Sequence, residues 1–166
     1  MYQDFKDLLS AFHARGVKYL IVGGYAVILH AQPRATKDID LLIQTDLENA
    51  GAIFSALADF GLPLGDIKPG DFAARGNFFR FGHDPQGVDI LSEIPGVEFQ
   101  EAWRNRVESI VDPQTGQSAY FISEDDLLRS KIASGRPQDL ADADAIRQAM
   151  AVRRKRDRGD NPTGSA

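Results

Sequence analysis

A short apolar segment at residues 37–44 constrains the fold more than any other part of the chain. It reads KDIDLLIQ, so carboxylates occur only where the segment begins and apolar side chains fill both alternating positions after it. That pattern is typical of a strand buried on both faces. Residues 46–60 follow with apolar side chains at helical intervals, and Gly61 ends the run. A doubly buried strand beside an amphipathic helix predicts an α/β layer structure.

The other segments predict further helices and strands around this unit. Helical spacing and stop signals predict helices over residues 4–15 and 25–31, one opened by the capping residue Ser123, and a last one opened by Arg136-Pro137. Alternation and turn residues predict strands over 17–22, 77–81, 88–91, 107–111 and 118–122. The last four of these form two predicted hairpins, and the strand at 88–91 is expected to pair near residues 37–44.

Length and cysteine content limit the organisation of the chain. Its 166 residues suit one domain, which we place at residues 1–152, followed by a basic helix end and disordered tail at 153–166. The sequence contains no cysteine, so disulfides, thiolate metal sites and cysteine nucleophiles are excluded. Such a chain is at home in a reducing compartment, and we expect a cytoplasmic protein.

Charge and hydropathy exclude two classes of partner. The net charge of −5 is the opposite of what a protein needs to hold duplex DNA by general phosphate neutralisation. No apolar run approaches the roughly 20 residues needed to span a bilayer, and the first residues lack an export signal. We therefore expect neither duplex DNA nor a membrane as a partner.

Two carboxylates at the start of the buried strand are the first candidates for chemistry. In a strand, Asp38 and Asp40 point to the same face, roughly 7 Å apart at the backbone. Clustered anions repel unless they are solvated or bridged by a cation, and Mg²⁺ prefers carboxylate oxygens. The alternative is a pair of ordinary acids at an exposed strand end, because a bare Asp-x-Asp is frequent.

Two other features strengthen the metal-site interpretation. Gly23-Gly24 lies between a predicted strand and a predicted helix, where the missing side chains allow a phosphate to approach the backbone. For an isolated glycine pair, an ordinary tight turn is the simpler interpretation. Asp89 lies in the strand predicted to pair near residues 37–44, so it would add a third carboxylate.

Together these elements resemble the signature of the nucleotidyltransferase superfamily related to polymerase beta. The resemblance is to its small bacterial toxin-like members, including the toxins of type IV toxin-antitoxin systems. It rests on four spaced elements: VGG at 22–24, RATKDIDLLI at 34–43, the isolated Asp89, and KIASGRPQDLAD at 131–142. One departure is Gln138, which stands where these relatives usually have a lysine.

The resemblance implies a nucleotidyltransferase fold of the α/β (α+β) class, with a small mixed sheet flanked by helices and with C-terminal helices. It implies that two Mg²⁺ ions are bound, with NTP, by the catalytic residues Asp38, Asp40 and Asp89. It assigns nucleotide binding to Gly23, Gly24, Arg34, Thr36 and Lys131. Arg136 and Asp139 are expected to orient their neighbours rather than to bind metal.

Three hypotheses follow for function. The first is Mg²⁺-dependent transfer of a nucleoside monophosphate from an NTP to a hydroxyl on tRNA, a protein or a small molecule, as a toxin-antitoxin component with an antitoxin-like partner. The second is a non-catalytic member that binds a nucleotide or a partner, which the loss of charge at Gln138 favours. In the third, the aspartates are surface acids and the protein only binds a partner.

Overall fold

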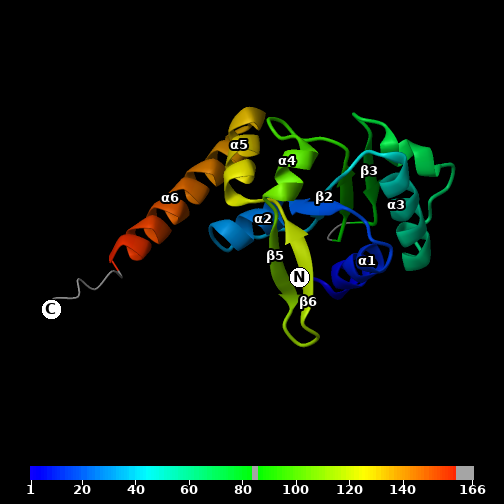
Figure 1. Cartoon of the computed structure of the whole chain (residues 1–166), viewed down its shortest axis with the longest axis horizontal. Helices are drawn as coiled ribbons and strands as arrows, with labels where there is room; N and C mark the ends of the chain where they lie inside the picture. Colours follow the sequence, from blue (N-terminus) through cyan, green and yellow to red (C-terminus); the bar gives the residue numbers. More distant parts are fainter. Residues whose placement is uncertain (84–85, 160–166) are drawn as a thin grey trace.

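The computed structural model describes residues 1–83 and 86–159 (Figure 1). Its helices are α1 (Gln3–Ala14), α2 (Gly23–His30), α3 (Leu47–Phe60), α4 (Phe99–Arg104), α5 (Glu124–Ser134) and α6 (Pro137–Gly159), with a 3₁₀ turn η1 (Pro69–Ala73). Its strands are β1 (Tyr19–Val22), β2 (Ile39–Ile43), β3 (Phe78–Phe81), β4 (Val88–Leu91), β5 (Val107–Asp112) and β6 (Gln117–Phe121).

Within these residues the strands form one six-stranded mixed sheet in the order β3-β4-β2-β1-β6-β5. β2 pairs in parallel with β4 and antiparallel with β1, while β1 pairs in parallel with β6. Both predicted hairpins are present, as the antiparallel pairs β3–β4 and β5–β6. The mixed sheet flanked by helices confirms the predicted fold class.

The most constraining segment of the sequence forms the centre of this sheet. In β2, Ile39 and residues 41–43 are buried, as the doubly apolar pattern predicts. The helix that follows is capped at Asp46, whose side chain accepts a hydrogen bond from the backbone N–H of Asn49. It ends at Gly61, whose φ of 90° is the left-handed conformation that glycine adopts readily. This strand-helix unit is confirmed.

Four features differ from the sequence-based expectation. Gly23 and Gly24 form the first turn of α2 instead of a separate turn before it, and α6 continues as a helix to Gly159. The short elements η1 and α4 were not predicted, because five- and six-residue helices are too brief to show helical periodicity. Residues 160–166 of the predicted tail lie outside the described residues.

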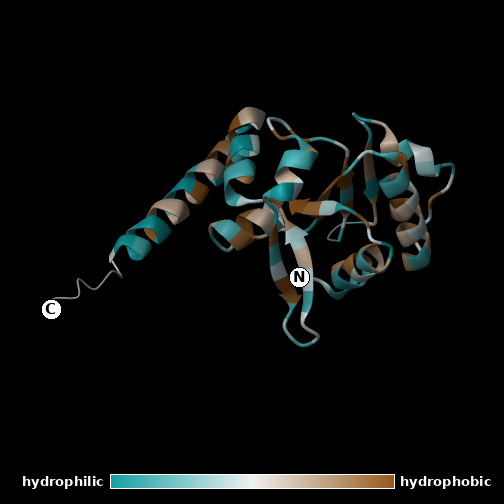
Figure 2. Ribbon diagram, in the orientation of Figure 1, coloured by the Kyte–Doolittle hydropathy of each residue, from teal (hydrophilic) through white to brown (hydrophobic). Residues whose placement is uncertain are grey.

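The helices enclose the sheet from different directions. α1 packs against α3, while α2 lies against β1 and β2 and also contacts α5 and α6. Figure 2 shows apolar residues concentrated in the central strands and hydrophilic residues along much of the outer helices, while the β5–β6 hairpin is mixed. The end of α6 extends away from the sheet (Figure 1), and its last residues, 151–159, are exposed. No helix in the described ranges combines the length and apolar character needed to cross a membrane.

Candidate active site

An open cleft of about 1150 Å³ lies where the start of β2, the start of α2 and the α5–α6 corner meet. Every residue that the sequence singled out lines it: Gly23, Gly24, Arg34, Thr36, Asp38, Asp40, Asp89, Lys131, Arg136 and Asp139. These positions span more than a hundred residues of the chain, and the sheet topology brings them together. The cleft is therefore the candidate site.

Two carboxylates face each other across neighbouring strands. The parallel register of β2 and β4 places Asp40 directly opposite Asp89, whose exposed fraction is only 8 %. Residues in register on adjacent strands project from the same face of a sheet. The third carboxylate, Asp38, precedes the first residue of β2 and accepts a hydrogen bond from the Gly87 N–H at 3.0 Å. The three acids therefore lie at one edge of the cleft.

The surroundings of Asp40 and Asp89 disfavour the ionised forms of these two carboxyl groups. Burial, and then the Asp89 carboxylate, raise the pKa of Asp40 from its ordinary value of 3.8 to about 6, and Asp38 adds a smaller increase. Lys131 and a backbone hydrogen bond from Gly24 oppose this rise. Burial also raises the pKa of Asp89. Burial is thus the main reason why these two carboxyl groups hold their protons more tightly than usual.

Arg80, on β3, supplies positive charge to two of the three acids. Its Nη1 lies 3.2 Å from Oδ2 of Asp89, and its Nη2 donates to Oδ2 of Asp38 at 2.9 Å. Arg80 was not among the site residues predicted from the sequence. A prediction of the β3–β4 register would have placed Arg80 opposite Asp89 and so indicated this contact.

The glycine pair has a close-packing role that explains its composition. A Cβ on Gly23 would lie 2.0 Å from Oδ2 of Asp40, and Gly23 has a φ of 61°. A Cβ on Gly24 would lie 2.4 Å from Oγ1 of Thr36. The absent side chains therefore let Asp40 and Thr36 pack directly against the first turn of α2.

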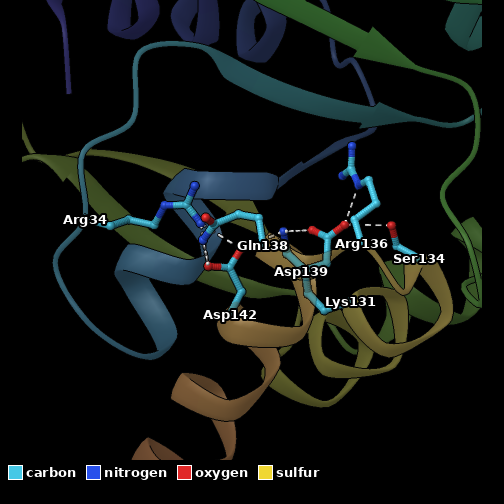
Figure 3. Close-up of polar contacts among 7 residues, drawn as sticks. All are labelled: Arg34, Lys131, Ser134, Arg136, Gln138, Asp139 and Asp142. Carbon is cyan, nitrogen blue, oxygen red and sulfur yellow. Dashed lines mark hydrogen bonds and ion pairs between the residues drawn. The ribbon is translucent and has the colours of Figure 1, made fainter.

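Another part of the cleft lining is an ion-pair network that joins α5 and α6 to the loop before β2 (Figure 3). Nζ of Lys131 lies 2.7 Å from Asp139 and 3.0 Å from Asp142. Arg34 donates from Nη1 to both oxygens of Asp142, at 2.5 and 2.7 Å. Arg136 donates from Nε to Asp139 at 2.5 Å. The network thus runs from Arg34 through Lys131 to Arg136, with a buried aspartate at each junction.

The two aspartates of this network are held in their ionised forms. Burial opposes ionisation of Asp139, but hydrogen bonds from Arg136, Lys131 and Ser134 hold its pKa well below the usual range. Burial likewise opposes ionisation of Asp142, whose pKa is lowered chiefly by Lys131. Asp142 was not among the predicted site residues, although it lies in the C-terminal motif.

Gln138 stands at the position where the resemblance leads us to expect a lysine. Its side-chain amide donates to Asp142 at 3.2 Å, while Asp139 is balanced by Lys131 and Arg136. A glutamine at this position therefore leaves neither aspartate without a cation, because Asp142 also pairs with Lys131 and Arg34. The guanidinium of Arg136 is largely solvent-facing, with 76 % of the side chain exposed.

The donor chemistry of the acidic edge fits a divalent cation. All three groups are carboxylates, which Mg²⁺ prefers, and Asp40 is a desolvated acid beside other acids. Among the residues that the structure describes, no group of three or more Asp, Glu, His or Cys side chains is arranged to hold a metal ion. In this arrangement Arg80 contacts Asp38 and Asp89.

A comparison with protein families identifies one match over most of the chain. A family model described as "Nucleotidyltransferase of unknown function (DUF6036)" matches residues 3–151. The match includes every residue of the cleft named above. A search of curated proteins finds no significant match.

Proposed function

Since the chain belongs to this family of nucleotidyltransferases of unknown function, we propose that it transfers a nucleoside monophosphate from an NTP to a hydroxyl-bearing acceptor in a Mg²⁺-dependent reaction. The observation that carries the proposal is the convergence of Asp38, Asp40 and Asp89 at one edge of the cleft, beside the first turn of α2. Clustered carboxylates next to a glycine-bearing helix start suit a triphosphate-binding site.

The three aspartates are the groups that would hold the two Mg²⁺ ions. When bound, the ions would offset charge on the phosphates and lower the pKa of an attacking hydroxyl. Asp40 and Asp89 would fix the geometry, because each projects from a strand of the central sheet and is held in register with the other. Asp89 would also accept a proton from the acceptor hydroxyl.

The remaining cleft residues would bind and orient the nucleotide. Gly23 and Gly24 line the cleft in the first turn of α2, and a helix N-terminus is suited to binding a phosphate. Arg34 and Arg136 carry guanidinium groups at the two ends of the network, and Lys131 lies between them. Asp139 and Asp142 would position these cations, because each accepts hydrogen bonds from the network while buried. Thr36 lies against Gly24 at the same end of the cleft.

The acceptor belongs to one of three classes: tRNA, a protein or a small molecule. We place the reaction in the cytoplasm, because the chain has no cysteine. A role as a toxin-antitoxin component, with an antitoxin-like partner, is the biological setting we propose for it.

Labelled NTPs test the reaction directly. The chain is incubated with each α-labelled NTP, Mg²⁺, and separated RNA, protein and small-molecule fractions of a cell extract. We expect label in one fraction, and no label when EDTA replaces Mg²⁺. Equal labelling with and without Mg²⁺ would contradict the proposed chemistry.

A second candidate function is nucleotide or partner binding without transfer. The ion pairs of Arg80 with Asp38 and Asp89 favour it, because they occupy carboxylates that transfer requires. Calorimetry separates the two functions. Binding of Mg²⁺-NTP without turnover during long incubation with extract would support this candidate over the first.

A further inference from the structure

Arg80 directly contacts two of the three acids at the edge of the cleft, Asp38 and Asp89. The antiparallel register of β3 and β4 sets Arg80 directly across from Asp89. One nitrogen, Nη1, lies 3.3 and 3.2 Å from the two oxygens of Asp89, and the other, Nη2, lies 2.9 Å from Asp38. A single guanidinium therefore bridges two of the three carboxylates to which we assign metal binding.

The backbone at Gly87 leaves room for the contact between Arg80 and Asp38. Gly87 donates its N–H to Oδ1 of Asp38, and a Cβ at Gly87 would lie 2.7 Å from that oxygen and 3.0 Å from Nη2 of Arg80. A side chain at position 87 would therefore crowd both partners of the contact between Arg80 and Asp38.

A divalent cation and the Arg80 guanidinium need the same oxygen atoms. Carboxylate lone pairs that accept hydrogen bonds from an arginine are not available to a metal, and two cations held within a few ångströms of each other repel. The side chain of Arg80 is 44 % exposed, so it has solvent into which to withdraw. Arg80 and a metal ion therefore compete for Asp38 and Asp89.

We infer that Arg80 is an internal counter-ion of the site, which stabilises the clustered carboxylates without metal and must release Asp38 and Asp89 when a divalent cation binds. This rests on the proposed function, because it takes those aspartates as metal ligands. It assigns Arg80 a positioning and regulatory role that sets how tightly the site takes up its metal. An ion pair of purely structural value would leave metal affinity unchanged.

Manganese binding without nucleotide tests the inference. Free Mn²⁺ is measured by electron paramagnetic resonance at neutral pH for the wild type, Arg80→Gln and Arg80→Lys. We expect Arg80→Gln to bind Mn²⁺ about tenfold more tightly, as loss of a nearby positive charge requires, and Arg80→Lys to remain close to wild type. The matched control is Arg75→Gln, which removes an exposed arginine paired with Glu93 and Glu98 outside the acidic edge; its affinity should equal that of the wild type.

Thermal unfolding gives an independent readout of the same competition. Without metal, Arg80→Gln should melt below the wild type, because Asp38 and Asp89 lose their counter-ion, and Mn²⁺ should raise its melting temperature by more than it raises that of the wild type. If Arg80→Gln does not fold, Arg80→Met, which keeps an unbranched side chain without the charge, takes its place. Tighter Mn²⁺ binding by Arg80→Met than by Arg75→Gln supports the inference, and equal binding overturns it.

Asp40→Asn distinguishes failure of this inference from failure of the proposed function. If Asp40→Asn abolishes Mn²⁺ binding but every Arg80 variant binds Mn²⁺ like the wild type, the counter-ion role is overturned while the metal site stands. If no variant and no wild-type protein shows Mn²⁺ binding that depends on Asp40, both are overturned.

Discussion

Asp40 of β2 and Asp89 of β4 lie opposite each other in parallel register, so two acids from segments 49 residues apart share one face of the sheet at the cleft. Each has its pKa raised, and burial is the largest cause for both. A pair of this kind costs folding stability when both members are ionised. This cost agrees with the metal-binding role that we propose for the pair at the cleft.

Asp40→Asn should stabilise the metal-free protein near neutral pH. The pKa of Asp40 is raised in the folded state from 3.8 to about 6, so the folded state holds this proton more tightly than the unfolded state. Protonated Asp40 therefore contributes to the free energy of unfolding below about pH 4, and this contribution is lost as pH rises through about 6. At pH 7 we expect the variant to gain on the order of 1 to 3 kcal/mol in free energy of unfolding, measured by urea denaturation with EDTA.

The pH profile supplies the control for this substitution. The gain of Asp40→Asn should shrink to nothing between pH 6 and pH 4, whereas Asp59→Asn, which changes an exposed acid paired with Arg15, should show no such profile. A constant difference between Asp40→Asn and wild type across this range would contradict the assigned pKa.

Gly23→Ala should destabilise the protein and open the cleft edge. The new Cβ would meet the Asp40 carboxylate at 2.0 Å, at a backbone position with positive φ. We expect a loss of about 2 kcal/mol or more in free energy of unfolding. Gly51→Ala is the matched control, since it lies within α3 with no atom within 4 Å of the added Cβ and should be neutral or stabilising by up to about 1 kcal/mol. Equal effects of the two substitutions would contradict the close packing of Asp40 on α2.

Asp139→Asn should be strongly destabilising, because it leaves Lys131 and Arg136 short of a buried partner. The Asp139 side chain is 3 % exposed and lies 2.7 Å from Nζ of Lys131. Removing one member of a buried ion pair typically costs about 3 kcal/mol or more. On the same helix, Asp144→Asn removes an exposed pair with Arg147 and should cost less than about 0.5 kcal/mol. Urea denaturation of both variants checks the contrast.

We expect Asp139 also to make the folding stability of the wild-type protein sensitive to low pH. The pKa of Asp139 is held below its ordinary value in the folded state, so its contribution is present above about pH 4 and is lost as pH falls toward the folded pKa. The Asp139→Asn variant should lose less stability between pH 5 and pH 3 than the wild type does. Parallel pH profiles for the two proteins would show that Asp139 does not carry this acid sensitivity.

The sequence predicts the fold well where local pattern decides structure. The alternation around β2, the Asp46 and Ser123 caps and the Gly61 stop are local signals, and each appears in the structure. The sequence also predicted that the strand carrying Asp89 pairs near residues 37–44, and β4 does pair with β2.

Contacts that depend on register or on helix packing escape this kind of prediction. Arg80 meets Asp38 and Asp89 only because β3 pairs with β4 in one register, and a shift of one residue would turn its side chain to the other face. Asp142 meets Lys131 because α5 packs against α6, which no local pattern encodes. The missed residues are thus those whose partners lie on another element.

The assignment of Asp38, Asp40 and Asp89 as a transfer site is tested most directly by comparing the rate of nucleotide transfer by Asp40→Asn with that of the wild type. Both proteins, with Asp59→Asn as a folded surface control, are incubated with α-labelled NTP, Mg²⁺ and the acceptor fraction, and incorporated label is counted over time. If Asp38, Asp40 and Asp89 form a transfer site, wild type and Asp59→Asn incorporate label equally, and Asp40→Asn falls by about a hundredfold or more. Incorporation by Asp40→Asn at the wild-type rate would contradict the assignment of this cleft as the active site.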